Sequence, residues 1–414
     1  MRKLKLLLLV LVTLALALGL TVHRHDQTAR LDHGAADGPL ELTGTPLERG
    51  RYLAAAADCM ACHTGAGAED YSGGVAFDLP IGTIYSSNLT ADQETGIGAW
   101  SEDEFVDAVR AGVAPGGRHL YPAHPYTSYA GLARNDVIAI RAYLMSLPAV
   151  RREVPATTLV WPFSQRRLIG LWNTFYQPAV GYRAQADHDL AWNRGAYLAN
   201  ALGHCGECHT PRNLAYAPAP RHTYQGAITR GWKAYDITPK GLAHWRAGDL
   251  DRYLATGHAP GHGSTVGPMK EVVLYSTAQL TPDDRAALVD YLLAGRTGEV
   301  VAQPAPQSVA NAQSLGGSLY AGACAGCHAL TPTSTAPAYA DLTGASTVRD
   351  PEGTNLLKVL AEGSPHGMGT DMAMPAFGQG YSDAERAALA NYVLAQWGGL
   401  PPALTPKDAQ AAAR

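Results

Sequence analysis

The sequence predicts a mostly α-helical protein in which three similar modules follow one another after an N-terminal export segment. All six cysteines form three pairs with the spacing Cys-x-x-Cys, and a histidine follows each pair directly. Similar short stretches precede the pairs, and an amphipathic helical pattern closes each region that follows. A length of 414 residues is compatible with two or three domains of ordinary size.

Each module is expected to begin with a short helix that delivers its cysteine pair. The pattern is Arg-Gly-Arg-Tyr-Leu-Ala before Cys59 and Arg-Gly-Ala-Tyr-Leu-Ala before Cys205, with a looser Gly-Gly-Ser-Leu-Tyr before Cys324. Apolar residues at helical spacing predict the closing helices. These helices are expected at 135–147, 282–293 and 383–397.

These signals set the domain boundaries. The three modules are placed at 40–150, 188–297 and 315–400, the linkers at 151–187 and 298–314, and a frayed tail at 401–414. The second linker reads as a flexible joint. The first contains a basic, aromatic stretch, for which a helix covering a module core is the preferred interpretation. Packing across a module boundary and contact with a partner protein remain alternatives.

Residues 1–30 predict a signal peptide or a membrane anchor. Arg2, Lys3 and Lys5 precede an uncharged run at 6–22, which is long for a signal core and short for a membrane span. A retained anchor is slightly favoured. With either fate, the basic residues stay in the cytoplasm and the chain after Val22 crosses the membrane, so we expect the periplasmic face of the bacterial inner membrane.

Composition excludes several classes of protein. Six cysteines in 414 residues are too sparse for a disulfide scaffold, and partners two residues apart would close a very short loop. A formal charge of −4, with 16% charged residues, lacks the basic surface of a nucleic-acid binder. A hydrophobic content of 46% argues against a chain dominated by disorder.

The Cys-x-x-Cys-His motifs predict covalent attachment of three c-type haems. Two cysteines three positions apart on a helix face the same side, so their sulfurs can bond one haem, and the adjacent histidine can bind its iron. The attachment residues are Cys59, Cys62, Cys205, Cys208, Cys324 and Cys327, and the proximal ligands are His63, His209 and His328. Zinc ribbons and thioredoxin-type redox motifs are weaker alternatives, because neither requires a histidine after every pair.

The sixth iron ligand is predicted from loops that precede the closing helices. In the second module the candidate is Met269, in Gly-Pro-Met, with His258 and His262 as alternatives. In the third module Met374, in Ala-Met-Pro, is preferred over Met368 and Met372.

The corresponding loop of the first module, 118–126, contains no methionine. His124 occupies the position that matches Met269, so we expect His/His ligation there. Methionine ligation raises haem potentials, and the first haem is therefore expected to have the lowest of the three. The alternatives are that His119 binds the iron or that no side chain does.

Three stretches resemble the tri-haem cytochrome c subunits of bacterial membrane-bound dehydrogenases. They are Gly-His-Cys-Gly-Glu-Cys-His-Thr-Pro-Arg-Asn at 203–213, Pro-Ile-Gly-Thr-Ile-Tyr-Ser-Ser-Asn-Leu-Thr at 80–90 and Gly-Ala-Trp-Ser at 98–101. The resemblance extends from about residue 45 to 398. It implies cytochrome c-like domains in a subunit that passes electrons from an alcohol, aldehyde or gluconate dehydrogenase to membrane ubiquinone. The family's first module usually offers methionine where this chain has His124.

The residues alone also favour an electron carrier over an enzyme. Haems with both axial positions filled cannot bind a substrate, and the chain has neither Gly-x-Gly-x-x-Gly nor His-Glu-x-x-His. A dehydrogenase catalytic subunit and ubiquinone or another respiratory acceptor are the expected partners. The alternative is a multihaem enzyme such as a peroxidase, in which one haem keeps an open site.

Overall fold

The computed structural model describes residues 37–413 apart from 41, 43, 295–299, 302–307, 330–336 and 365–372. Helices dominate this part of the chain, which confirms the mostly α prediction, and the sheets described are four two-stranded antiparallel hairpins. The predicted export segment at 1–30 lies outside the described residues. Among the residues that are described, no helix combines the length and apolar character needed to cross a membrane.

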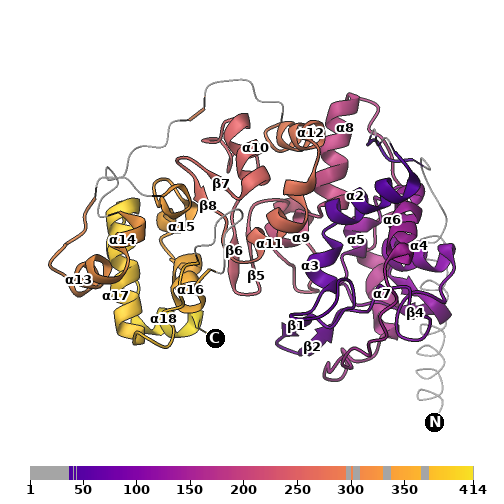
Figure 1. Cartoon of the computed structure of the whole chain (residues 1–414), viewed down its shortest axis with the longest axis horizontal. Helices are drawn as coiled ribbons and strands as arrows, with labels where there is room; N and C mark the ends of the chain where they lie inside the picture. Colours follow the sequence, from indigo (N-terminus) through magenta and orange to yellow (C-terminus); the bar gives the residue numbers. More distant parts are fainter. Residues whose placement is uncertain are drawn as a thin grey trace, which may run out of the picture. The chain divides into compact units, whose positions relative to one another are not determined.

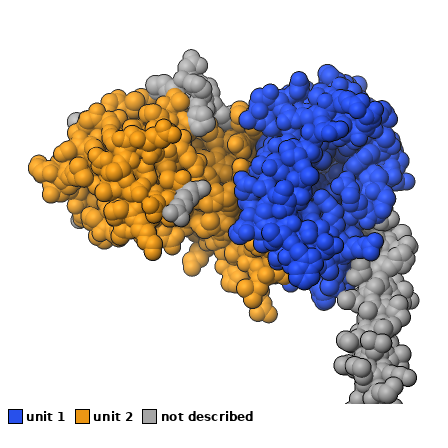
Figure 2. Space-filling view, turned by 90° about the horizontal axis from the view of Figure 1, so that it is seen from below, with its two compact units in different colours: residues 1–207 blue, residues 208–414 orange. Residues whose placement is uncertain are grey.

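The chain divides into two compact units, residues 1–207 and 208–414 (Figure 2). The boundary between them falls inside the second Cys-x-x-Cys-His motif and not in the linker predicted at 151–187. The division into three domains therefore stays a prediction.

Unit 1 begins with α2 (Pro46–Ala56), which is set by a capping box between Thr45 and Glu48 and by a proline in its first turn. The further elements of this unit follow in chain order (Figure 1). They are α3 (Cys59–His63), β1 (Ala76–Leu79), β2 (Gly82–Tyr85), α4 (Glu102–Ala111), β3 (Val113–Ala114), β4 (Arg118–His119), α5 (Tyr126–Tyr129), α6 (Arg134–Ser146), α7 (Arg167–Tyr176) and α8 (Leu190–Tyr197), which continues into a π-helical turn (Leu198–Leu202).

The opening and closing helices of the first motif region, α2 and α6, pack closely against each other. Gly50 makes the approach possible, because a Cβ atom there would lie 1.9 Å from the carbonyl oxygen of Ala139. The fully buried Leu53 and Leu144 lie on the same two helices. The predicted closing helix at 135–147 differs from α6 by one residue at each end.

The basic, aromatic stretch of the first predicted linker forms α7, which packs on the preceding elements of unit 1. The Tyr126 hydroxyl donates to Asn173 Oδ1 over 2.8 Å, and the Gln177 amide donates to the Arg110 carbonyl over 3.0 Å. This packing agrees with the interpretation of a helix over a core. Trp161 and Phe175 are 79% and 72% exposed, so only part of the aromatic stretch contributes to that packing.

Unit 2 contains the end of the second motif and the whole of the third. Helix α9 (Gly206–His209) runs across the boundary. The further elements are β5 (Ala227–Thr229), β6 (Trp232–Ala234), α10 (Ala247–Thr256), β7 (His258–Ala259), β8 (Gly263–Ser264), α11 (Pro268–Tyr275), α12 (Pro282–Leu292), α13 (Leu315–Ala323), α14 (Ala325–His328), α15 (Ser346–Arg349), α16 (Thr354–Glu362), α17 (Asp383–Val393) and α18 (Pro406–Ala412) (Figure 1).

Helices α13 and α17 repeat the packing of α2 on α6. A Cβ atom on Gly316 would lie 2.1 Å from the Ala388 carbonyl oxygen, just as Gly50 faces Ala139. Tyr320 and Trp397 fill the core beside this contact, with ring centroids 5.0 Å apart. The first and third motif regions therefore share a helix pair that depends on one glycine.

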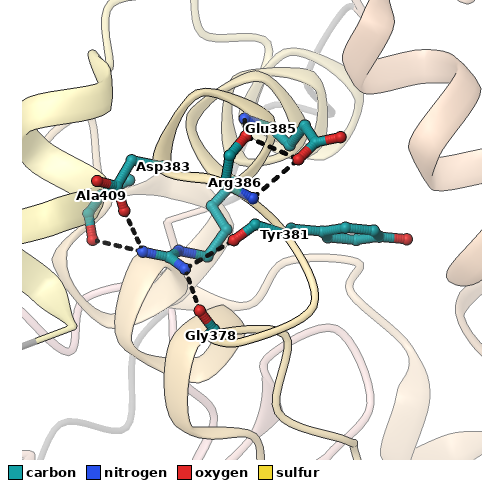
Figure 3. A network of polar contacts seen from close by, with 7 residues as sticks. Gly378, Tyr381, Asp383, Glu385, Arg386 and Ala409 are labelled. Carbon is teal, nitrogen blue, oxygen red and sulfur yellow. Dashed lines mark hydrogen bonds and ion pairs between the residues drawn. The ribbon is translucent and has the colours of Figure 1, made fainter.

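The C-terminal tail is folded, contrary to the expectation of a frayed segment at 401–414. Helix α18 packs on α16 and α17 and buries Ala409. Arg386 of α17 donates to the carbonyls of Gly378, at 2.7 Å, and Tyr381, at 3.0 Å, and it also contacts Asp383 and the Ala409 carbonyl (Figure 3). One buried guanidinium thus joins the tail, the closing helix and the loop that follows Met374.

Part of the second predicted linker is also docked. The Ser308 hydroxyl donates to Gln396 Oε1 over 2.7 Å, and the Val309 amide donates to the Ala395 carbonyl over 3.2 Å. The residues at 302–307 lie outside the described part of the chain. The flexible-joint interpretation therefore does not apply to 308–309, which belong to the third motif region.

Within unit 2, the second and third motif regions meet backbone to backbone. Gly344 has a φ of +74°, and a Cβ atom there would lie 1.9 Å from the Gly261 carbonyl oxygen. Lys233 of β6 adds a polar contact, because its ammonium lies 2.7 Å from Asp350 Oδ1 and its amide donates to Asn355 Oδ1 over 2.7 Å.

Replacing Gly316 with alanine is expected to lower the free energy of unfolding by about 2 kcal/mol, because the added methyl group meets a backbone carbonyl that cannot move independently. The matched control is Gly322→Ala in the same helix, where a Cβ atom meets nothing within 4 Å. There alanine is expected to add up to about 1 kcal/mol through helix propensity. Urea unfolding followed by far-ultraviolet circular dichroism measures both effects, and equal stabilities of the two variants would contradict the packing described.

Candidate functional site

The three Cys-x-x-Cys-His motifs lie on short helical turns, α3, α9 and α14. Burial raises the pKa of the Cys59 thiol to about 12 and that of the Cys324 thiol to about 11. Redox-active dithiols depend instead on a lowered thiol pKa. The surroundings of the first and third motifs thus disfavour the thioredoxin-type alternative.

The histidine of each motif is held by one ring nitrogen. The Nδ1 atom of His63 lies 2.7 Å from the Ser87 carbonyl oxygen, that of His209 lies 2.6 Å from the Tyr235 oxygen, and that of His328 lies 2.7 Å from the Ala340 oxygen. A carbonyl oxygen can only accept, so Nδ1 carries the proton and Nε2 keeps the lone pair. This is the arrangement that fixes a metal-binding imidazole.

The same turn supports all three accepting carbonyls. The residue after each carbonyl is Asn88, Asp236 or Asp341, and its side-chain oxygen accepts from the amide of the threonine two residues later. The distances are 2.9 Å to Thr90, 2.8 Å to Thr238 and 2.8 Å to Thr343. Such Asx turns fix the local backbone. These turns were not predicted from the sequence, although Asn-Leu-Thr, Asp-Ile-Thr and Asp-Leu-Thr repeat at 88–90, 236–238 and 341–343.

Glycines bring the first two histidines close to these turns. The amide of Gly73 donates to the His63 carbonyl over 2.7 Å, and that of Gly226 donates to the His209 carbonyl over 2.8 Å. Both have positive φ, 77° and 89°. A Cβ atom on Gly73 would lie 2.6 Å from the Ser87 oxygen, the acceptor of the His63 proton. A side chain at this position would therefore displace the acceptor.

The first and second regions present their predicted sixth ligands on the same backbone frame. Helix α4 ends at Gly112 and α10 at Gly257, both with left-handed φ. A short hairpin follows each glycine, with Val113 paired to His119 and His258 paired to Ser264. In both regions the hairpin is closed by an amide that donates back to the capping glycine, over 2.7 Å and 2.8 Å.

His124 and Met269 occupy the same position in this frame, each 12 residues after its capping glycine. The Nε2 atom of His124 is buried and has no hydrogen-bond partner. Burial and the nearby His63 lower the pKa of His124 to about 3, against the opposing effect of hydrogen bonds to the backbone of α4. A neutral imidazole with a buried, unsatisfied nitrogen fits the role of iron ligand.

The predicted position of Met269 in a loop is wrong in detail. Met269 is the second residue of α11, directly after Pro268 in the first turn, because proline is well suited to begin a helix. Gly267 precedes the helix with a φ of 55°, and a Cβ atom there would lie 2.5 Å from the Trp232 ring.

Met374 lies in a loop, as expected. It pairs with Ser364 through two backbone hydrogen bonds of 2.9 Å, just after α16 ends at Gly363. Met374 also packs against the core of the third region. The competing Met368 and Met372 lie outside the described residues.

The alternative ligands of the second region have other neighbours. The Nδ1 atom of His258 lies 3.1 Å from the Ser264 hydroxyl. The His262 ring stacks on Trp245 at a centroid distance of 3.7 Å, and its Nε2 atom lies 3.8 Å from Asp249 Oδ2. Neither histidine shares the register of His124, so Met269 stays the preferred candidate.

Comparison with known proteins places these features in a family. The cytochrome c family profile matches residues 47–148, and the profile described as "Cytochrome C oxidase, cbb3-type, subunit III" matches residues 311–393. The gluconate 2-dehydrogenase cytochrome c subunit of Pantoea cypripedii is 35% identical over 392 residues, 87% of this chain and 88% of that protein. The chain belongs to the family of cytochrome c subunits of dehydrogenases. Cytochrome c domains imply covalently bound haem c, in agreement with the motifs.

Two further relatives extend the family. The fructose dehydrogenase cytochrome subunit of Gluconobacter japonicus is 36% identical over 386 residues, 85% of this chain and 79% of that protein. A nicotinate dehydrogenase subunit of Pseudomonas putida is 41% identical over 358 residues, 84% of this chain. The matched region is only 30% of that longer protein, so this cytochrome c chain spans about a third of it.

Asp236→Ala is expected to destabilise the cytochrome by about 1–2 kcal/mol, because it removes the acceptor for the Thr238 amide and hydroxyl and frees the turn that carries the Tyr235 carbonyl. Asp236→Asn keeps a side-chain oxygen in place and is expected to change stability by less than half as much. Thermal unfolding compares the two variants. Equal losses for asparagine and alanine would mean that the charge of Asp236, and not the turn, is the important property.

Proposed function

We propose that this cytochrome c subunit carries three covalent haem c groups and transfers electrons. The donor would be a dehydrogenase catalytic subunit, and the acceptor membrane ubiquinone or another respiratory acceptor at the periplasmic face of the inner membrane. The observation that supports it most is the repeated pairing of the motif histidine Nδ1 with a loop carbonyl, at 2.6–2.7 Å in all three motifs. In all three motifs the histidine Nε2 atom thereby keeps a lone pair that can bind iron.

The assignment of residues to haems follows the motifs and the ligand register. Thioether attachment uses the two cysteines of each motif, and the histidine after them is the proximal ligand. The complete sets are Cys59, Cys62, His63 and His124 for the first haem, Cys205, Cys208, His209 and Met269 for the second, and Cys324, Cys327, His328 and Met374 for the third.

Each haem would supply a one-electron iron couple, and the protein residues determine its orientation and potential. The loop carbonyls fix the proximal rings and increase the electron donation of Nε2. The sixth side chain closes the other face of the haem to substrate. Imidazole in the first site and thioether in the other two would give the first haem the lowest potential.

The relatives support a catalytic partner, since two of them are named as cytochrome subunits of gluconate and fructose dehydrogenases. The decisive experiment is purification of the complex from detergent-solubilised membranes of the source cells. A larger catalytic subunit should co-purify, and its substrate should reduce the haems of this chain within the complex. A single chain that oxidises a substrate without a partner, or that keeps a high-spin haem and binds cyanide readily, would instead indicate a multihaem enzyme.

The haem count is tested by intact mass and by a haem-to-protein ratio, which should be three. The double variant Cys205→Ala, Cys208→Ala should lose one haem and keep two, because thioether bonds are required for retention in each motif. A mature protein with two haems, or a double variant with an unchanged mass increment, would contradict the count.

His124→Met is expected to raise the lowest midpoint potential by more than about 0.1 V, within the range of about 0.8 V over which axial ligands tune haem iron. It should also introduce one further absorption band of the kind that thioether-ligated ferric haem gives. The matched control, His119→Met, should leave all three potentials in place. The opposite result, with a shift for His119→Met alone, would assign the ligand to His119.

A further inference from the structure

One short helix of unit 1, α5, contacts both His124, the predicted sixth ligand of the first haem, and the second motif. Helix α5 begins two residues after His124 and ends at Tyr129. The ring centroids of Tyr129 and His124 lie 5.4 Å apart. The Tyr129 ring also meets His204, the residue before Cys205, edge to face at 5.5 Å. A single aromatic ring therefore joins the predicted sixth ligand of the first haem to the second attachment motif.

Tyr129 is held rigidly in this position. The residue is 6% exposed, and its hydroxyl donates to the Ala57 carbonyl over 2.7 Å. Ala57 lies two residues before Cys59, so the hydroxyl is anchored to the segment that carries the first motif. The hydroxyl end of the ring is thus anchored to the backbone, and burial restricts the rest of the side chain.

The same helix is fastened to the second motif by hydrogen bonds. The Ser128 hydroxyl donates to Glu207 Oε1 over 2.9 Å, and the Thr127 hydroxyl reaches the same oxygen at 3.3 Å. Glu207 lies between Cys205 and Cys208. A carboxylate inside the motif accepts from two consecutive residues of α5, which fixes the distance between the helix and the motif.

We propose that Tyr129 couples the first haem site to the start of the second attachment motif for electron exchange, and that α5 holds His204 and Glu207 against the first site. The proposal rests on the proposed function. With haem bound, one electron would pass from the reduced iron of one site to the ferric iron of the other, without making or breaking a bond. The Tyr129 hydroxyl would stay protonated and donate its hydrogen bond to the Ala57 carbonyl throughout. Tyr129 is a positioning and coupling residue and not a catalytic one.

The test measures intramolecular electron exchange in the full-length holoprotein. A brief pulse of reductant reduces one haem, and absorption then follows the redistribution between the His/His and His/Met haems. Tyr129→Leu should slow this step several-fold, because it removes the ring that contacts both His124 and His204. Tyr129→Phe keeps the ring and should stay within about twofold of the unmodified protein.

Tyr126→Leu is the matched control. Its ring also neighbours His124, at 6.4 Å, but packs edge to face on Trp172 of α7. It should leave the exchange rate within about twofold. Equilibrium titration of every variant must give unchanged midpoint potentials, because only then does a slower rate report coupling and not driving force. An unchanged rate in Tyr129→Leu, with unchanged potentials, would overturn the proposal.

If Tyr129→Leu fails to retain its haems, the exchange rate is measured in Ser128→Ala instead. This variant removes one hydrogen bond to Glu207 and keeps the Tyr129 ring. Slower exchange in that variant supports the proposal, and an unchanged rate contradicts it. The haem count and spin state of the unmodified protein are measured on the same samples. A wrong haem number or a high-spin first haem in the unmodified protein would contradict the proposed function. An unchanged exchange rate in a variant that carries all three haems would contradict only the role of Tyr129.

Discussion

The hydrogen bond from each motif histidine to a loop carbonyl is the constraint on which the rest of the structure depends. It leaves Nε2 as the only ring nitrogen available to a metal. To place the carbonyl, the chain uses an Asx turn after each acceptor, at Asn88, Asp236 and Asp341. In the first two regions a glycine with positive φ also brings the histidine backbone to that turn. The hairpins and the opening helices support these hydrogen bonds between the motif histidines and the loop carbonyls.

In each region the segment that carries the candidate sixth ligand follows a helix that ends at a glycine. Gly112, Gly257 and Gly363 terminate α4, α10 and α16, and the candidate sixth ligand follows 11 or 12 residues later. The glycine cap and the hairpin are shared by the first two regions, but His124 lies two residues before α5 and Met269 lies inside α11. The two candidate ligands therefore differ in side chain and in local backbone. Burial keeps the His124 imidazole neutral, as iron ligation requires.

Local patterns were sufficient to predict the motif turns and the closing helices, since α12 begins at Pro282 and α17 at Asp383, as expected. Features that depend on distant partners were not predicted. The tail forms α18 because Arg386 and the neighbouring helices cover it, and nothing in its alanine-rich sequence indicates that contact. The location of Met269 in a helix was missed, although Pro268 is a recognisable helix start. The contact of Tyr129 with His204 joins residues 75 positions apart, which no repeat or periodicity encodes.

The close approach of Gly261 and Gly344 has an evolutionary consequence. If the motif regions were structurally independent domains, gene duplication could add or exchange one of them without changing the others. Here the backbones of two neighbouring regions approach so closely that a Cβ atom on Gly344 would meet the Gly261 carbonyl, and Lys233 contacts Asp350 and Asn355. A replacement for the third region would need its own glycine and its own acid at these points. Substitutions at these contacts in one region are therefore constrained by the residues of the other.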